Sequence, residues 1–176
     1  MISKKARSMS SAGHIAKSQS IGNSGQVKYY QSCKAAGLDV KKSTGKQDIA
    51  HIDFFVDDAS VDVKGLKESH KEGKIILEVL NVQGKGGWCS DSGPEWIAFD
   101  FGAFFLHAKT KDLVKVIKAK CDLKDKVKKI GESLYKGYTR RDRKDLMTTV
   151  MLNDVIKDCE HWYLPNREWS PPMDLI

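Results

Sequence analysis

The sequence of 176 residues contains no long apolar run. A membrane-spanning helix needs roughly 18 or more consecutive apolar residues, and no segment approaches that length. Lys4, Lys5 and Arg7 make the N-terminus basic, but no apolar stretch follows them as it would in a secretory signal. We therefore expect a cytoplasmic protein that neither enters a membrane nor is secreted.

Motifs typical of metal-binding thiols and of several enzyme classes are missing as well. The cysteines form neither a CxxC pair nor the spacing of a zinc site. The glycine-rich stretch QGKGGWCSDSG lacks the GK[ST] arrangement of a P-loop, and neither HExxH nor a nucleophile-elbow motif occurs. Reduced structural thiols are the simplest account of the four cysteines, which are Cys33, Cys89, Cys121 and Cys159.

Positive charge is in excess. The chain has 30 Lys and Arg against 23 Asp and Glu, a net charge of +7 and a sequence pI near 9.1. This balance favours a polyanionic partner such as nucleic acid, although a soluble protein with a basic surface has the same composition. The length allows one domain with a substantial core.

Composition divides the chain into three parts. Residues 1–24 are rich in Ser, Lys and Gly and poor in large apolar residues, which predicts a flexible basic arm that either contacts phosphates or has no role. Residues 25–165 carry the periodic segments and are expected to form the functional domain. Residues 166–176 include two adjacent prolines and should be an irregular tail.

Periodicity within the domain predicts a central mixed β-sheet flanked by helices, an α/β (α+β) fold. A helix is expected to end at Gly37, and later helices to be capped by Thr110 and Asn153. Residues 145–159 can also be read as one continuous helix. The predicted segments are helices at 25–37, 110–121 and 153–162 and strands at 51–56, 61–65, 74–82 (central), 95–101, 103–108 and 145–152.

Two short runs within HIDFFVDDASVDVKG have the alternation of a half-buried β-hairpin. Because successive side chains of a strand point to opposite faces, Asp53, Asp62 and Lys64 share one face. A two-residue loop at 57–58 would place Asp53 opposite Asp62, and a four-residue loop at 57–60 would place it opposite Lys64. The other face carries the apolar row of Ile52, Phe54, Val56, Val61 and Val63.

This group of charges predicts a metal-dependent site. Two carboxylates within about 4 to 6 Å of each other repel and tend to hold a proton or recruit a cation. Mg²⁺ (or Mn²⁺) takes oxygen ligands from one or two carboxylates and leaves positions for water and phosphate. Lys64 would orient the attacking water or counter charge on the phosphate. The alternative is an exposed hairpin face with an Asp–Lys ion pair of little consequence.

HIDFFV followed by VDVKG resembles the two-strand signature of the PD-(D/E)XK nuclease superfamily, the restriction-endonuclease-like fold. Asp53 matches the first acidic position, Asp62 the second and Lys64 the lysine. The element order and short spacing are similar to those of archaeal-type Holliday junction resolvases and of small phage or bacterial nucleases. The proline of the motif is absent, and Gln26 is among the residues that stand where many relatives carry a helical acid.

The resemblance implies a Mg²⁺-dependent DNA endonuclease that leaves a 5′-phosphate and a 3′-hydroxyl and that forms homodimers to cut two strands. Metal would be held by Asp53, Asp62 and the Val63 carbonyl. Lys64 would be the catalytic lysine, and Glu78, a lone carboxylate in an apolar strand, would support it.

Basic residues in two later segments are expected to contact the DNA backbone, namely Lys85, Arg140, Arg141 and Arg143. The rival interpretation is a nucleic-acid-binding module without catalysis, in which the acidic residues are structural. An RNA substrate is a further alternative, although no aromatic RNP-type pattern occurs.

Overall fold

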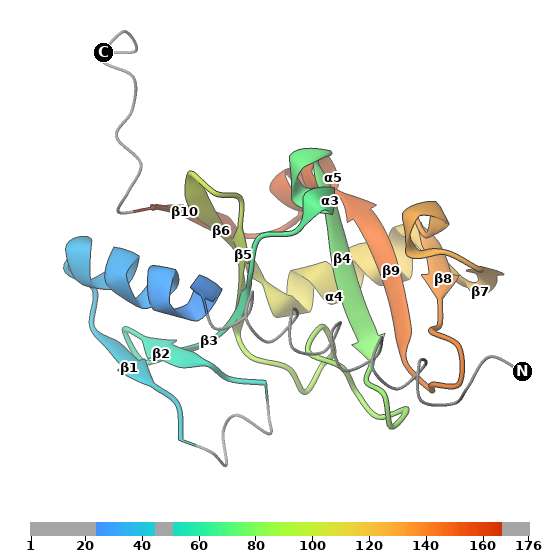
Figure 1. Ribbon diagram of the computed structural model, residues 1–176, viewed down its shortest axis with the longest axis horizontal. Helices are drawn as coiled ribbons and strands as arrows, with labels where there is room; N and C mark the ends of the chain where they lie inside the picture. Colours follow the sequence, from blue (N-terminus) through green and yellow to red (C-terminus); the bar gives the residue numbers. More distant parts are fainter. Residues whose placement is uncertain (1–23, 45–50, 167–176) are drawn as a thin grey trace, which may run out of the picture.

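The computed structural model describes residues 24–44 and 51–166 (Figure 1). The predicted basic arm, except for Ser24, and the predicted tail beyond Asn166 lie outside these ranges. Asn166 itself is buried, and its side-chain amide donates to the Gly102 carbonyl at 2.6 Å. In the described part of the chain, no helix has both the length and the apolar character needed to cross a membrane.

The described residues form an α+β fold with two mixed sheets, which confirms the predicted class (Figure 1). The larger sheet has the order β1-β2-β3-β5-β6-β10, in which β3 and β5 are parallel and the other neighbours are antiparallel. Its strands are β1 (Val40–Lys42), β2 (Phe54–Val56), β3 (Ala59–Lys64), β5 (Trp96–Asp100), β6 (Phe104–Lys109) and β10 (His161–Pro165).

The second sheet has the order β4-β9-β8-β7, with β7 and β8 parallel. Its strands are β4 (Lys74–Leu80), β7 (Asp122–Val127), β8 (Lys136–Tyr138) and β9 (Leu146–Met151). The chain is helical over residues 24–35, and the other helices are α3 (Glu68–Lys71), α4 (Thr110–Lys120), the 3₁₀ turn η1 (Ile130–Glu132) and α5 (Leu152–Asp158).

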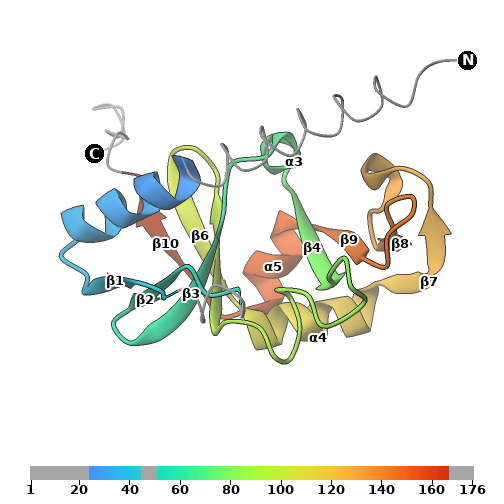
Figure 2. The same ribbon diagram turned by 60° about the horizontal axis from the view of Figure 1, so that its bottom comes forward.

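The central strands of the larger sheet, such as β5 and β6, are buried on both faces. On one face, Tyr29 and Cys33 of the first helix pack against a cluster that includes Val61, Val63 and Phe105. The other face belongs to a second cluster shared with α4 and the second sheet, which includes Ile97, Leu113 and Val150. Figure 2 shows the first helix beside β1, β2 and β3, and α4 on the side of β4 and β9. Side chains that point to opposite faces of β3 therefore have different neighbours.

The hairpin has the shorter of the two predicted loops. Asp57 and Asp58 have φ angles of 47° and 68°, the left-handed values of a two-residue hairpin turn. The β2–β3 pairing runs from Val56 opposite Ala59 to Phe54 opposite Val61. Beyond that pair the ladder becomes irregular, because the Asp53 N–H donates to the Val61 carbonyl at 2.9 Å.

The helix boundaries agree with prediction in part. The first helix ends as expected, with Gly37 at φ 75° and the Leu38 N–H donating to the Cys33 carbonyl at 3.0 Å. The caps of α4 and α5 are Lys109 and Met151, one and two residues before the predicted ones, and neither makes a side-chain capping bond. The continuous helix considered for 145–159 is wrong, because β9 precedes α5.

The prediction of a central strand at 74–82 is also wrong. β4 leaves the larger sheet and pairs only with β9, at the edge of the second sheet. The place beside β3 is taken by β5, which the chain reaches after the glycine-rich loop. An apolar run shows that a strand is buried, and it does not show which sheet the strand joins. β1, β7, β8 and β10 had no prediction.

Candidate active site

Asp62 and Lys64 lie on the face of β3 opposite Val61 and Val63, as the alternation predicted. Asp62 is 3% exposed, and the Lys64 Nζ lies 2.7 Å from its Oδ2. That carboxylate oxygen forms no aligned hydrogen bond within the described residues, so the ammonium compensates its charge as an ion-pair partner. A buried carboxylate with one cation and spare lone pairs is suited to a further positive ligand.

Asp53, the residue immediately before β2, joins this pair. Its Oδ2 accepts a hydrogen bond from the Val63 N–H at 2.8 Å, which ties the carboxylate to the strand that carries Asp62 and Lys64. Its Oδ1 accepts from the Gln26 Nε2, also at 2.8 Å. The hairpin and the first helix together therefore bring the three predicted charged residues to one place.

The two carboxylates affect each other's ionisation. Burial, followed by the neighbouring Asp62 charge, raises the pKa of Asp53 to about 6, and the Val63 N–H and the Lys64 ammonium oppose this shift. Burial also raises the pKa of Asp62, against the lowering effect of Lys64. A carboxylate pair that resists double ionisation is stabilised by a proton or by a cation.

Gln26 is a site residue to which the sequence assigned no role. It lies in the first turn of the described helix, beside Gly25, which approaches the backbone just after Lys64. A Cβ built on Gly25 would lie 3.0 Å from the Gly65 Cα. The sequence did contain a hint of this role for Gln26, because members of the resembled family carry a metal-contacting acid in the same helical region.

We expect Gly25→Ala to weaken the site and the fold together. The added methyl must push the helix away from Gly65, and overpacking of this kind costs about 1 to 3 kcal/mol in the free energy of unfolding. The shift also lengthens the bond between Gln26 and Asp53. Chemical denaturation measures the loss. Gly131→Ala is the matched control, because a Cβ there meets nothing within 4 Å. An equal effect of both substitutions would contradict the close approach at Gly25.

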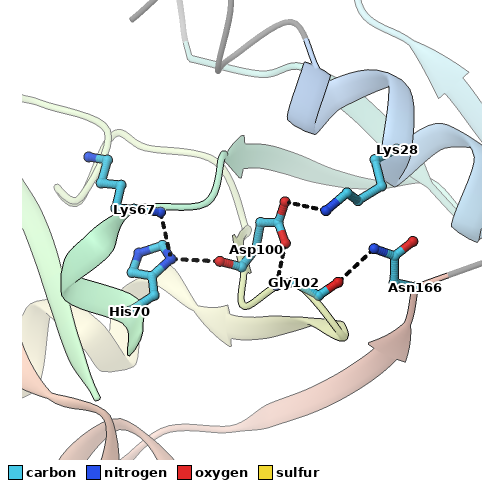
Figure 3. A network of polar contacts seen from close by, with 6 residues as sticks. All are labelled: Lys28, Lys67, His70, Asp100, Gly102 and Asn166. Atoms are coloured by element: carbon cyan, nitrogen blue, oxygen red, sulfur yellow. Dashed lines mark hydrogen bonds and ion pairs between the residues drawn. The ribbon is translucent and has the colours of Figure 1, made fainter. Parts of the chain in front are cut away.

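A polar network holds the first helix to the larger sheet (Figure 3). The Lys28 Nζ lies 3.1 Å from Oδ2 of Asp100, which is 2% exposed at the end of β5. The other carboxylate oxygen accepts from the Gly102 N–H at 2.7 Å, and the Asp100 carbonyl accepts from the His70 ring at 2.6 Å. The helix that carries Gln26 is therefore fixed to β5 as well as to the hairpin, and β5 is in turn bonded to α3.

An aromatic neighbour of Lys64 and an acidic neighbour of Asp62 come from beyond the hairpin. The Lys64 Nζ lies 4.5 Å from the ring centre of Trp88, which is buried in the core. Glu78, half-buried on β4, is close enough to Asp62 to raise its pKa. Part of the Lys67 side chain is exposed to solvent. Desolvation by the atoms packed around it, followed by the positive charge of Lys64, lowers the pKa of Lys67. Lys67 was not predicted as a site residue.

The basic residues predicted to contact nucleic acid occupy two adjacent turns. Lys85 lies in a tight turn closed by the Asn81 N–H donating to the Lys85 carbonyl at 2.8 Å. A Cβ on Gly84 would lie 3.3 Å from the Lys144 Cβ, so this turn lies against the 140–144 turn. Arg141 and Arg143 are exposed.

Arg140 differs from the other basic residues of its turn. It forms an ion pair with Asp145, whose side chain is fully buried, and it is close enough to Lys67 to help lower its pKa. Arg140 is therefore within electrostatic range of Lys67, which is itself near Lys64.

The donor set available to a metal ion is small. Among the described residues, no group of three or more His, Cys, Asp or Glu side chains is arranged to hold one. Mg²⁺, however, commonly uses one or two carboxylates and keeps several waters. Asp53 and Asp62, with the buried Oδ2 of Asp62 lacking an aligned hydrogen bond, fit that mode of binding.

The chain matches no protein-family model, and comparisons with curated proteins and with solved structures also find no match. The resemblance to the PD-(D/E)XK nucleases therefore stays a prediction.

Proposed function

We propose that the protein is a Mg²⁺-dependent nuclease that hydrolyses DNA phosphodiester bonds. The observation that carries this proposal is the cluster of Asp53, Asp62 and Lys64, in which two interacting carboxylates lie beside a lysine. A purely structural Asp–Lys pair needs only one carboxylate. The second carboxylate raises the energy of the metal-free site, which is the expected cost of a site arranged for a cation.

Each residue has a separate task in the proposed reaction. Asp53 and Asp62, with the Val63 carbonyl, would hold Mg²⁺ or Mn²⁺, which when bound supplies Lewis acidity and lowers the pKa of water. Lys64 orients the attacking water and counters charge that develops on the phosphate. Glu78 lies near enough to Asp62 to modulate its charge.

Gln26 and Trp88 position these groups. The Gln26 amide holds one Asp53 oxygen, and the Trp88 ring lies against the Lys64 ammonium. Both contacts restrict side chains that would otherwise be free to rotate, which preserves the geometry of the reacting groups.

The DNA backbone would contact the two basic turns, through Lys85, Arg140, Arg141 and Arg143. The net charge of +7 supports a polyanionic substrate. A homodimer would allow both strands of a duplex to be cut. The free cysteines in the described residues accord with a reducing compartment, which supports the cytoplasm as the location.

The test is cleavage of supercoiled plasmid and of labelled linear, single-stranded and four-way-junction DNA, in Mg²⁺, Mn²⁺ or EDTA, with matched RNA strands. We expect cleavage with either metal and none in EDTA, with 5′-phosphate ends. If the protein binds these DNAs but cuts none in any metal, it is a binding module and the nuclease proposal is wrong. Cleavage restricted to the RNA strands would make it a ribonuclease.

A further inference from the structure

A cavity of about 660 Å³ lies between the first helix and strands β1 and β2, and Gln26 connects it with Asp53. Its lining includes Gln26, whose amide is hydrogen bonded to Asp53, and Phe54, the residue that follows Asp53. Gln31 and Lys42 contribute polar groups, and the first helix contributes the apolar surface of Val27 and Tyr30. Its size falls within the range of small-molecule sites, which is about 300 to 1,000 Å³.

The helical wall of the cavity exposes large apolar side chains that the fold does not cover. Val27 is 58% exposed and Tyr30 is 40% exposed, although the same helix buries Tyr29 and Cys33 completely. The Tyr30 and Phe54 rings lie with their centres 6.3 Å apart and tilted by 30°. The cavity therefore has an accessible aromatic surface backed by a buried ring.

The other groups of the lining are those that recognise a nucleobase and its phosphate. An aromatic ring stacks on any base, which makes such contacts tolerant of sequence. The glutamine amides can donate and accept hydrogen bonds to base edges, and Lys42, which is exposed, offers a positive charge. The Lys34 Nζ, 5.9 Å from the Tyr30 ring centre, adds positive charge nearby.

We propose that this cavity binds an unpaired nucleobase next to the phosphate to be cleaved, with the base stacked on Tyr30. This inference rests on the proposed function and narrows it. The substrate would be DNA with unpaired nucleotides at the cleavage position, such as a single strand, a flap or an overhang. A fully paired duplex presents no free base face to the cavity.

Fluorescence of 2-aminopurine tests base binding without requiring cleavage. The probe is a duplex with a single-stranded overhang carrying 2-aminopurine at its first unpaired position, titrated with full-length protein in Ca²⁺. A blunt duplex with a paired 2-aminopurine is the comparison. We expect the overhang fluorescence to be quenched on binding and the overhang to bind about tenfold more tightly than the blunt duplex.

Tyr30→Leu should remove most of this preference, because leucine retains apolar area and cannot stack. Gln31→Ala provides a second, smaller change in the same lining. Tyr163→Ala is the matched control, because Tyr163 is another tyrosine of similar exposure, 47%, on β10. It should retain the full preference for the overhang, and blunt-duplex affinity should be unchanged in all three variants.

The outcomes separate the two proposals. Equal affinity of wild type for both probes, or an equal loss of affinity for both in Tyr30→Leu, would overturn the base site even if the protein cuts DNA. The expected quenching together with no cleavage in any metal would support base binding and refute the nuclease. If quenching occurs only with an RNA overhang, the cavity is not a DNA site.

Discussion

Replacing Lys64 by methionine should lower metal-dependent DNA cleavage by about a hundred- to a thousandfold, the usual effect of removing one group that stabilises charge in the transition state. The Lys64 ammonium lies 2.7 Å from Asp62 and next to the Trp88 ring, so its position is fixed before substrate binds. Methionine keeps much of the apolar length of the side chain and removes the charge. Initial rates on a labelled oligonucleotide, compared at equal protein concentration, measure the effect.

Lys109 offers a closely matched control for this substitution. Its side chain is 19% exposed against 20% for Lys64, it forms an ion pair with Glu160 at 2.8 Å, and its Nζ lies 5.2 Å from the Trp96 ring centre. Lys109→Met therefore removes the same kinds of contact elsewhere on the same sheet. A comparable loss of cleavage in both variants would show that the effect is structural.

Removal of Lys64 leaves the buried Asp62 carboxylate without its cation, which could destabilise the protein. Asp62→Asn tests the site without this effect. The asparagine has nearly the same shape and no charge, so it needs no cationic partner. We expect an equally severe loss of cleavage with DNA binding retained in Ca²⁺. Retained cleavage in a folded Asp62→Asn protein would remove Asp62 from the site.

Asp53→Asn is expected to stabilise the metal-free protein at neutral pH. Burial and the neighbouring Asp62 raise the pKa of Asp53 to about 6 in the folded protein, whereas the unfolded value is about 3.9. The folded state therefore holds the proton more tightly, and stability falls as pH rises from about 4 to about 6, then stays lower. Because Asp53 retains some solvent contact, we expect a penalty of about 2 kcal/mol.

Thermal unfolding in EDTA at a series of pH values measures this effect. Asparagine does not titrate, so the variant should melt about 4 to 8 °C above wild type at about pH 8, and the difference should vanish near pH 4. Mg²⁺ should raise the melting temperature of wild type near pH 8 much more than near pH 5, where protons compete for the carboxylates. Asp53→Asn should show little response to Mg²⁺.

Asp39→Asn is a control with the opposite sign. Its hydrogen bond with Lys41 lowers the pKa of this exposed carboxylate, so its charge favours the folded state above its pKa. This variant should not gain stability at neutral pH, and its response to Mg²⁺ should match wild type. If Asp53→Asn instead loses stability across the whole pH range, the two carboxylates do not repel and the argument for a cation site fails.

Local features of the sequence predicted the hairpin well. Alternation of apolar and polar residues decided which side chains share a face, because a strand has a period of two whatever its surroundings. The same reasoning placed Asp62 with Lys64, and it placed Val61 with Val63 on the other face. The end of the first helix was equally local, because Gly37 adopts the left-handed conformation that stops a helix.

The length of the hairpin loop was left open by the same pattern. Both loop lengths kept the apolar row intact, so burial could not choose between them. The backbone conformation of Asp57 and Asp58 decided it, since both residues adopt positive φ in the two-residue turn. The irregular pairing at Asp53 then allowed its carboxylate to reach the Val63 N–H.

The sequence by itself determined the α+β class, the excess positive charge and the shared face of Asp62 and Lys64, because composition and side-chain period are properties of single segments. Only the tertiary structure decided the rest. β4 pairs in the second sheet, and Gln26 is hydrogen bonded to Asp53, which is 27 residues away in sequence. The cavity next to Gln26 lies between a helix and a sheet. Such contacts depend on how distant segments pack, which no local periodicity encodes.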